Sequence, residues 1–470
     1  MSLSKTIAKN TLIHTIGKFI GSLIGLIIIG LLTRYLGTAG YGYYTTIFSY
    51  LFFFATIGDL GLYLISINEL GRAGADKNKI FSNIFTLRFL SGIILMILAS
   101  ILIWFFPYPL LVKTGALIGA LSVFLMMMDQ ITVSLFQEQM KTKYVALAEI
   151  LGKALTLGLM IVLIKIQAGF LYVIWATLGG LALHFTINIF FAKKLFNFGF
   201  AYDRDVWQDI LKKSWPIATY MIFSMIYFKA DTIILSLYQS AETVGLYGAP
   251  YKILEVLISF PAIFMGLIAP HLSRSWQEKN INDFTQIFQK AFDFLSLFAW
   301  PLIWGALVLA KPIINFIAGA EFIAAAPILK ILMVATGVIF IAYIPTYTVV
   351  SINKQKQMMP FYVLAAAMAL SLYFIFIPRY SYWAAALITV GVEFFILVNS
   401  WLMVKKQSGL KINFINNFKA LLASIVMATV ILLLDLNLLP SLILGIVVYG
   451  ICLWLLGVIN KDLIKEFKKI

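Results

Sequence analysis

The chain has 470 residues, of which 62% are hydrophobic and only 12% are charged. Globular proteins are about 45–50% apolar, and a soluble fold of this length needs far more charge to cover its surface, so the composition excludes a water-soluble fold and indicates a bilayer. Lysine and arginine outnumber aspartate and glutamate by 36 to 20, a net charge of +16, but these cations punctuate apolar runs and therefore indicate membrane topology rather than nucleic-acid binding.

The first apolar run follows Lys5 and Lys9, as the core of an export signal would. Lys18 interrupts it, no small-x-small cleavage site follows, and it continues to Leu32, so we expect an uncleaved membrane helix. A spanning helix needs about 20 mostly apolar residues. On this measure the sequence predicts an all-α polytopic membrane protein with about fourteen spans: 12–33, 42–67, 82–106, 110–135, 144–164, 169–191, 215–238, 247–270, 292–316, 323–349, 359–377, 382–403, 416–435 and 438–458.

The loop cations support this count. With fourteen spans, 25 lysines and arginines fall on one side of the membrane and five on the other. Positive charge accumulates on cytoplasmic loops, so we expect a multi-pass protein of the cell's inner, cytoplasmic membrane with both termini in the cytoplasm. The loops on the opposite side are short, which predicts no globular domain there.

The long basic connection at 192–214 divides the first twelve spans into six and six. The sequence therefore predicts an N-terminal six-helix lobe (1–200), a C-terminal six-helix lobe (201–404) and a two-helix appendage (405–470). Gly42-x-Tyr44 after the first span matches Gly245-x-Tyr247 after the seventh. The same motif at the same point of each half indicates a duplicated architecture, as in many transporters.

Charges inside a bilayer are costly and usually face a cavity or a partner. Glu149 and Lys153, four residues apart, and Lys252 and Glu255, three apart, share helix faces, so local pairing competes with a binding role for these lysines. The other embedded cations lack a same-helix partner and either line a cavity or extend to the membrane surface. Together the candidate substrate-binding cations are Lys18, Arg88, Lys153, Lys229, Lys252 and Lys330.

Three embedded carboxylates are candidates for ion coupling, because a membrane carboxylate can change protonation with access. Asp59, between Gly58 and Gly61, is the leading candidate, followed by Asp231 and Glu393. The alternative is a carboxylate satisfied by neighbouring hydroxyls or lysines. His184 is expected to be a hydrogen-bonded interior residue. The sequence shows no metal-ligand spacing, so no metal site is predicted.

Several stretches resemble the Wzx-type polysaccharide and O-antigen flippases of the multidrug/oligosaccharidyl-lipid/polysaccharide exporter superfamily. They lie at 18–21, 34–44, 57–62, 229–235 and 244–247. The resemblance implies two six-helix lobes that alternate between inward-open and outward-open states and move an undecaprenyl-diphosphate-linked oligosaccharide to the outer leaflet. It implies membrane lipids and other polysaccharide assembly proteins as further partners.

Three alternatives stay open at this point. A lipid II flippase shares fourteen helices and a diphosphate substrate, and a drug/cation antiporter of the same superfamily typically has twelve helices and an acidic cavity. A membrane polysaccharide polymerase or glycosyltransferase belongs to another class, but the short outer loops and the absence of a catalytic constellation oppose it. We therefore expect a transporter with no catalytic residues and no cofactor, except for a coupling proton or sodium ion.

Overall fold

The computed structural model describes residues 3–72, 74 and 76–458, without the side chains of residues 3–16, 19, 216 and 220. Throughout this part the secondary structure is helical, with no strand among the described residues. The all-helical fold predicted from the sequence is confirmed. The cations expected near the two chain ends, Lys5, Lys9 and those after residue 460, lie outside the described side chains.

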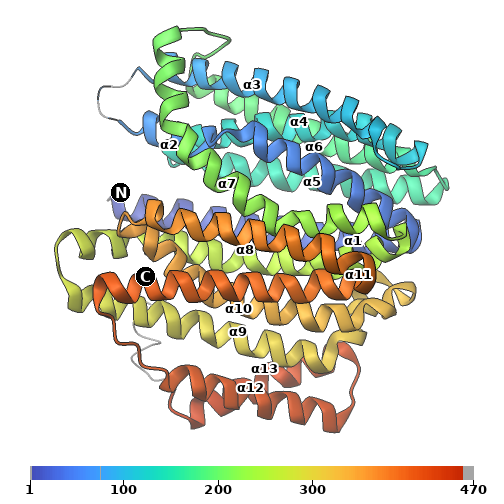
Figure 1. Cartoon of the computed structure of the whole chain (residues 1–470), viewed down its shortest axis with the longest axis vertical. Coiled ribbons are helices and arrows are strands. Elements are labelled where there is room, and N and C mark those ends of the chain that lie inside the picture. The colour runs from blue at the N-terminus through green and yellow to red at the C-terminus, as the bar shows by residue number, and fades with distance from the viewer. Residues whose placement is uncertain (1–2, 73, 75, 459–470) are drawn as a thin grey trace. The chain divides into compact units, whose positions relative to one another are not determined.

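The helices follow one another with short connections (Figure 1). The first half contains α1 (Leu3–Asp59), α2 (Leu62–Leu70), α3 (Lys77–Leu102), η1 (Ile103–Phe105), α4 (Leu110–Glu138), α5 (Lys143–Lys165), α6 (Phe170–Leu195) and α7 (Arg204–Tyr238). The second half contains α8 (Ala241–Gln277), α9 (Ile281–Ala318), η2 (Ala320–Ala325), α10 (Ala326–Ser351), α11 (Gln355–Ser408), α12 (Ile415–Leu434) and α13 (Leu438–Leu455).

Twelve helical segments of the described chain are long and apolar enough to cross a membrane, and two of them are twice the usual length. Ile20–Leu70 has 51 residues and Gln355–Ser408 has 54. A span needs about 20 residues, so each segment has enough residues for two of the predicted spans. Single residues with positive φ bend them, Gly37 (φ 64°) and Ser381 (φ 54°). The connection expected at 34–41 is therefore present but shorter than predicted, because two helices meet at Gly37 and the residues on either side of it are helical.

The second predicted span, 42–67, is not one continuous helix. The chain leaves α1 after Asp59 and passes through Leu60 (φ 50°) and Gly61 (φ 72°) before α2 begins. A side chain is strained at such a φ, and a Cβ on Gly61 would also come within 3.0 Å of Ile217. This break places the Asp59 carboxylate at a helix end.

The chain separates into two compact units, Met1–Gly245 and Leu246–Ile470. In the first unit α6 packs on α4 and α5, while α1 packs along α3, α4, α5 and α7. Ile47, Leu51 and Met127, each fully buried, belong to its core. The predicted boundaries near residues 200 and 404 stay predictions.

The connection between α6 and α7 is fixed to α3. The amides of Gly199, Ala201 and Asp203 donate to side-chain oxygens of α3. Between these amides, the rings of Phe198 and Phe200 also pack against α3, on Phe81 and Phe89. Because donors and aromatic rings alternate, residues 198–203 lie along α3 as an extended segment and orient the start of α7.

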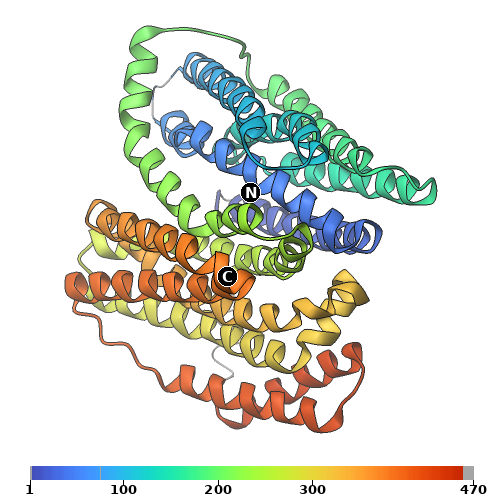
Figure 2. The same cartoon turned by 45° about the vertical axis from the view of Figure 1, so that its right-hand side comes forward.

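In the second unit α10 packs against α9 and α11, and α12 and α13 pair with each other and contact α9 (Figure 2). The amides of Asn416 and Asn417 on α12 donate to Asp293 Oδ2 and Ser296 Oγ on α9, at 2.9 and 2.8 Å. Polar side chains thus hold one end of α12 on α9.

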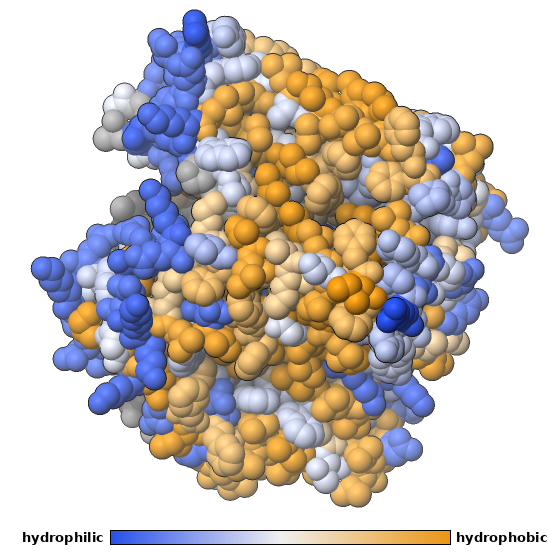
Figure 3. All heavy atoms as spheres, viewed as in Figure 1, coloured by the Kyte–Doolittle hydropathy of each residue, from blue (hydrophilic) through white to orange (hydrophobic). Residues whose placement is uncertain are grey.

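Hydrophobic and hydrophilic residues are segregated on the protein surface (Figure 3). On the face shown in Figure 3, apolar residues occupy the middle of the helices and hydrophilic residues gather at their ends. An apolar belt of this kind is the surface that lipid tails cover.

Candidate functional site

In the first unit, Asp59 at the end of α1 forms an ion pair with Arg88 in α3. Arg88 Nη1 lies 2.6 Å from Asp59 Oδ1, and the two side chains are only 1% and 6% exposed. Arg88 Nε donates to the carbonyl oxygen of Met127 at 3.0 Å, and Nη2 donates to Gln130 Oε1 at 2.8 Å. The pair therefore ties α1, α3 and α4 together.

The local fold explains why this pair forms. The break after α1 leaves carbonyl groups without helical partners, and Ser91 Oγ of α3 donates to one of them, the Gly58 oxygen, at 2.8 Å. Neither carboxylate oxygen of Asp59 accepts a hydrogen bond from a described residue, so the guanidinium supplies the compensating charge. In this structure neither Asp59 nor Arg88 faces open space. A headgroup role for Arg88 and a coupling role for Asp59 stay predictions, and both require the pair to open.

A second group, the lysine cluster, joins Lys18 of α1 to Glu149 and Lys153 of α5. Lys18 Nζ lies 3.0 Å from Glu149 Oε2, and Lys153 Nζ lies 2.8 Å from Glu149 Oε1. The pairing of Glu149 with Lys153 confirms the interpretation from their spacing. Lys18, which has no same-helix partner, finds one on a different helix.

Glycines on α1 make room for this cluster. A Cβ on Gly21 would lie 2.8 Å from Glu149 Oε1, and the Gly21 carbonyl accepts a hydrogen bond from Lys153 Nζ at 3.0 Å. A Cβ on Gly17 would lie 2.4 Å from the Cβ of Ala146. Close helix packing at these glycines brings the polar part of α5 against α1.

The lysine cluster is asymmetric in exposure. The Lys18 and Lys153 side chains are 44% and 35% exposed, whereas that of Glu149 is 10% exposed. The carboxylate is therefore less accessible than the two lysine side chains. With two cations and one anion, the accessible side of the cluster is positive and can bind an anion.

Asp129 of α4 and His184 of α6 lie beside the lysine cluster. His184 Nε2 is 3.4 Å from Asp129 Oδ2, and Asn188 Nδ2 donates to Asp129 Oδ1 at 2.7 Å. Lys18 and Glu149 are close enough to interact electrostatically with Asp129. The sequence indicated an interior histidine but not its partner, because α4 and α6 meet only in the folded unit. His184 Nε2 itself makes no hydrogen bond to a described residue.

The remaining candidates of the first unit lie on α7. Asp231 is fully buried, and its Oδ1 accepts hydrogen bonds from the amide and hydroxyl of Thr232, at 2.5 and 3.1 Å. Lys229 Nζ lies 5.7 Å from the centre of the Phe228 ring. The hydroxyl expected as an alternative partner of a membrane carboxylate is thus present at Asp231.

The second unit holds the other three candidates, which make no contact with one another among the described residues. Lys252 pairs with Glu255 on α8, Nζ to Oε2 2.8 Å, as their spacing predicted. Lys330 on α10 is partly buried and has no ion pair with a described residue. Glu393 on α11 is 6% exposed and has neither an ion pair nor a hydrogen bond to any residue in the described part of the chain.

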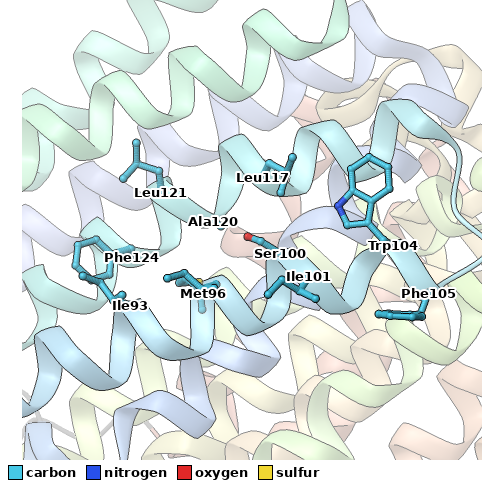
Figure 4. Close-up of a pocket in the computed structure, with 11 residues that line it drawn as sticks. Ile93, Met96, Ser100, Ile101, Trp104, Phe105, Leu117, Ala120, Leu121 and Phe124 are labelled. Carbon is cyan, nitrogen blue, oxygen red and sulfur yellow. The ribbon is translucent and has the colours of Figure 1, made fainter.

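Two grooves are apolar and do not suit a charged group. One, of about 770 Å³, lies between α4 on one side and α3 and η1 on the other, with Met96 and Trp104 facing Leu117 and Phe124 (Figure 4). The other, of about 620 Å³, lies between α9, α12 and α13. Their walls include no charged residue. A polar headgroup therefore fits the lysine cluster better than either groove.

The sequence profile of a family described as polysaccharide biosynthesis protein matches residues 7–276. No curated protein matches the sequence.

Several solved structures share the fold. A lipid II flippase, MurJ, in an inward closed conformation is similar with a TM-score of 0.78 at 19% identity, over 94% of this chain and 98% of that one. An inward-facing multidrug resistance transporter of the MATE family has a TM-score of 0.70 at 13% identity, over 85% of this chain and 98% of that one. The Vibrio cholerae MATE transporter VcmN has a TM-score of 0.64 at 14% identity, over 87% and 98%. At these identities the likeness shows the fold alone.

Proposed function

Since the chain belongs to the polysaccharide biosynthesis protein family, we propose that it is a flippase that moves a lipid-diphosphate-linked oligosaccharide of the undecaprenyl type from the inner to the outer leaflet. It works by alternating access and supplies cell-surface polysaccharide synthesis. In this proposal the chain is a transporter and not an enzyme.

The main support for this proposal is that the two lysine side chains of the lysine cluster are partly exposed. A diphosphate cannot cross apolar surface without compensating charge. Lys18 on α1 and Lys153 on α5 are partly exposed, and the more buried Glu149 carboxylate contacts both ammonium groups. Charge-assisted hydrogen bonds from ammonium to phosphate are among the stronger polar contacts in proteins. We therefore assign the diphosphate to the Lys18 and Lys153 side chains.

Flipping by the purified protein in liposomes tests this assignment. Lys18→Gln and Lys153→Gln should each lower the flipping rate of a lipid-diphosphate oligosaccharide at least about tenfold, because one lost charged contact is worth about 1.5–3 kcal/mol. Lys165→Gln is the matched control, since Lys165 is an exposed lysine at the end of the same helix. If both cluster variants flip the lipid as fast as Lys165→Gln does, the lysine cluster is not the headgroup site.

The proposal places the protein in the cytoplasmic membrane with both termini inside. The 25-to-5 distribution of loop cations supports this orientation. In a variant without Cys452, new cysteines at positions 77 and 406 should react with a membrane-impermeant thiol reagent only after the cells are opened. Reaction at either position in intact cells contradicts the orientation.

An ion gradient is the proposed energy source, with Asp59, Asp231 or Glu393 as the coupling carboxylate. Glu393 gains support from its burial without a partner among the described residues, whereas Asp59 has Arg88 beside it. Liposomes with an imposed pH or sodium gradient separate the candidates. Transport by Asp59→Asn with unchanged gradient dependence assigns the role to Asp231 or Glu393, and gradient-independent transport by the parent protein contradicts coupling.

The glycan is tested by competing substrates. The family match favours intermediates of polysaccharide synthesis, and the structural likeness to a lipid II flippase makes lipid II the substrate to compare. The proposal expects faster flipping of a polysaccharide repeat-unit lipid than of lipid II. Faster flipping of lipid II supports the alternative.

A further inference from the structure

We propose that His184 makes anion binding at the lysine cluster depend on pH: uptake of one proton by the imidazole changes the net charge of the surrounding group from zero to +1 and strengthens binding of a diphosphate. The inference rests on the proposed headgroup site and adds a proton as its second ligand. Asp129 on α4 contacts His184 directly, and α5 packs against His184 at Gly152. The charged groups beside this contact are those of the lysine cluster, Glu149 and Lys153 on α5 and Lys18 on α1.

The charge balance gives the reason. With a neutral imidazole, the two ammonium groups of the lysine cluster are cancelled by the carboxylates of Glu149 and Asp129. Imidazole is the side chain that normally changes its charge between about pH 5 and 8. A proton on His184 is stabilised by Asp129, whose Oδ2 lies 3.4 Å from Nε2. The group then carries one uncompensated positive charge.

Burial of His184 and Asp129 limits the screening of this positive charge by water. The His184 and Asp129 side chains are 17% and 11% exposed, so water screens them little. His184 is also held against α5, because Gly152 lies next to it and a Cβ there would come within 2.8 Å of the His184 Cβ. Asn188 occupies the other oxygen of Asp129 and leaves Oδ2 toward the histidine. Asp129 is therefore the carboxylate in contact with the imidazole.

The linkage is reciprocal. If a proton strengthens anion binding by a given factor, a bound anion strengthens proton binding by the same factor. Couplings between sites of this kind are commonly about 5–150-fold. We expect about a tenfold stronger affinity for a diphosphate near pH 5.5 than near pH 8, in the range over which an imidazole titrates.

Calorimetric binding of UDP-glucose to the full chain in nanodiscs tests the inference. This probe is a soluble diphosphate diester whose phosphates do not titrate near neutral pH. All proteins carry His14→Gln, so that His184 and His271 are the two histidines left of the three in the chain. The parent should bind about tenfold more tightly at the lower pH. His184→Gln should lose this dependence, and His271→Gln, at an exposed position on α8, should keep it.

Two further variants make the result specific. Asp129→Asn removes one negative charge, so at about pH 8 it should bind UDP-glucose as tightly as the parent does at low pH. Lys153→Gln should weaken binding at every pH, which locates the probe at the lysine cluster. Binding by Lys153→Gln equal to that of the parent means that the probe lies elsewhere and overturns the inference.

The outcomes separate the inference from the function on which it rests. Binding by the parent that does not change with pH, or an unchanged pH dependence in His184→Gln, overturns the proton link and leaves the headgroup site standing. Absence of binding by the parent at both pH values contradicts the headgroup site itself, and with it the proton link.

Discussion

Replacing Arg88 by glutamine removes the cation of the buried ion pair in the first unit. The change takes away the 2.6 Å contact to Asp59 and the two hydrogen bonds that Arg88 donates to α4. It leaves the Asp59 carboxylate, 6% exposed, without a counter-charge. Breaking a buried pair from one side typically costs about 3–5 kcal/mol. We expect Arg88→Gln to lower the free energy of unfolding by this amount.

The double variant separates the ion pair from the packing around it. Asp59→Asn alone leaves a buried guanidinium that keeps its two hydrogen bonds, so its cost should lie at the lower end, about 3 kcal/mol. In Asp59→Asn/Arg88→Gln no charge stays buried, and the loss should be at least about 2 kcal/mol smaller than the sum of the single losses.

Unfolding in mixed micelles by added sodium dodecyl sulfate, followed by tryptophan fluorescence, measures these differences. Arg72→Gln is the matched control, because Arg72 forms an ion pair with Glu69 at 2.8 Å but is 60% exposed. Exposed pairs contribute about 0–1 kcal/mol. If Arg88→Gln is no less stable than Arg72→Gln, or if the single losses add fully in the double variant, the pair does not hold the unit together as argued.

Two other predictions concern packing and pH. A Cβ on Gly42 would lie 1.8 Å from a backbone oxygen, so Gly42→Ala should lower the free energy of unfolding by at least about 1–3 kcal/mol in the same assay. Gly158 has open space around it, so Gly158→Ala should be neutral or slightly stabilising. Equal stability of the two variants contradicts this packing. A hydrogen bond from Lys79 lowers the pKa of Asp203, so the contact stabilises above the unfolded pKa of about 3.9 and is lost as the pH falls through the lower folded value. Relative to the intrinsic exchange rate at each pH, the amides in 199–203 should be well protected at neutral pH, less protected in strong acid, and less protected at neutral pH in Lys79→Met. Equal protection in that variant contradicts the role of Lys79.

Much of the fold could be predicted because hydropathy and loop charge are local properties. The spans are found near the expected positions, since lipid requires about 20 apolar residues wherever a helix crosses. The prediction misses the break inside the second span, where Leu60 and Gly61 separate α1 from α2. The predicted connections at 34–41 and 378–381 are shorter than expected, because the helices on either side meet at Gly37 and at Ser381.

The candidate site could be predicted only in part. The Glu149–Lys153 and Lys252–Glu255 contacts could be predicted from the sequence, because residues three or four apart share one face of a helix. The contacts of Lys18 and Arg88 depend on which helices pack together, which the spacing of charges does not encode. One signal was available: Arg88 and Asp59 were both embedded charges without a same-helix partner, and such charges tend to pair with each other.

The most direct test of the proposed function is depletion of the protein in its native cell, with the leaflet of the lipid-linked oligosaccharide measured by protection from an impermeant glycan-modifying reagent. Depletion should cause the oligosaccharide lipid to accumulate on the cytoplasmic leaflet, and expression of the parent protein, but not of a Lys18→Gln/Lys153→Gln variant, should return it to the outer leaflet. An unchanged distribution between the leaflets after depletion would contradict the assignment of the chain as a flippase.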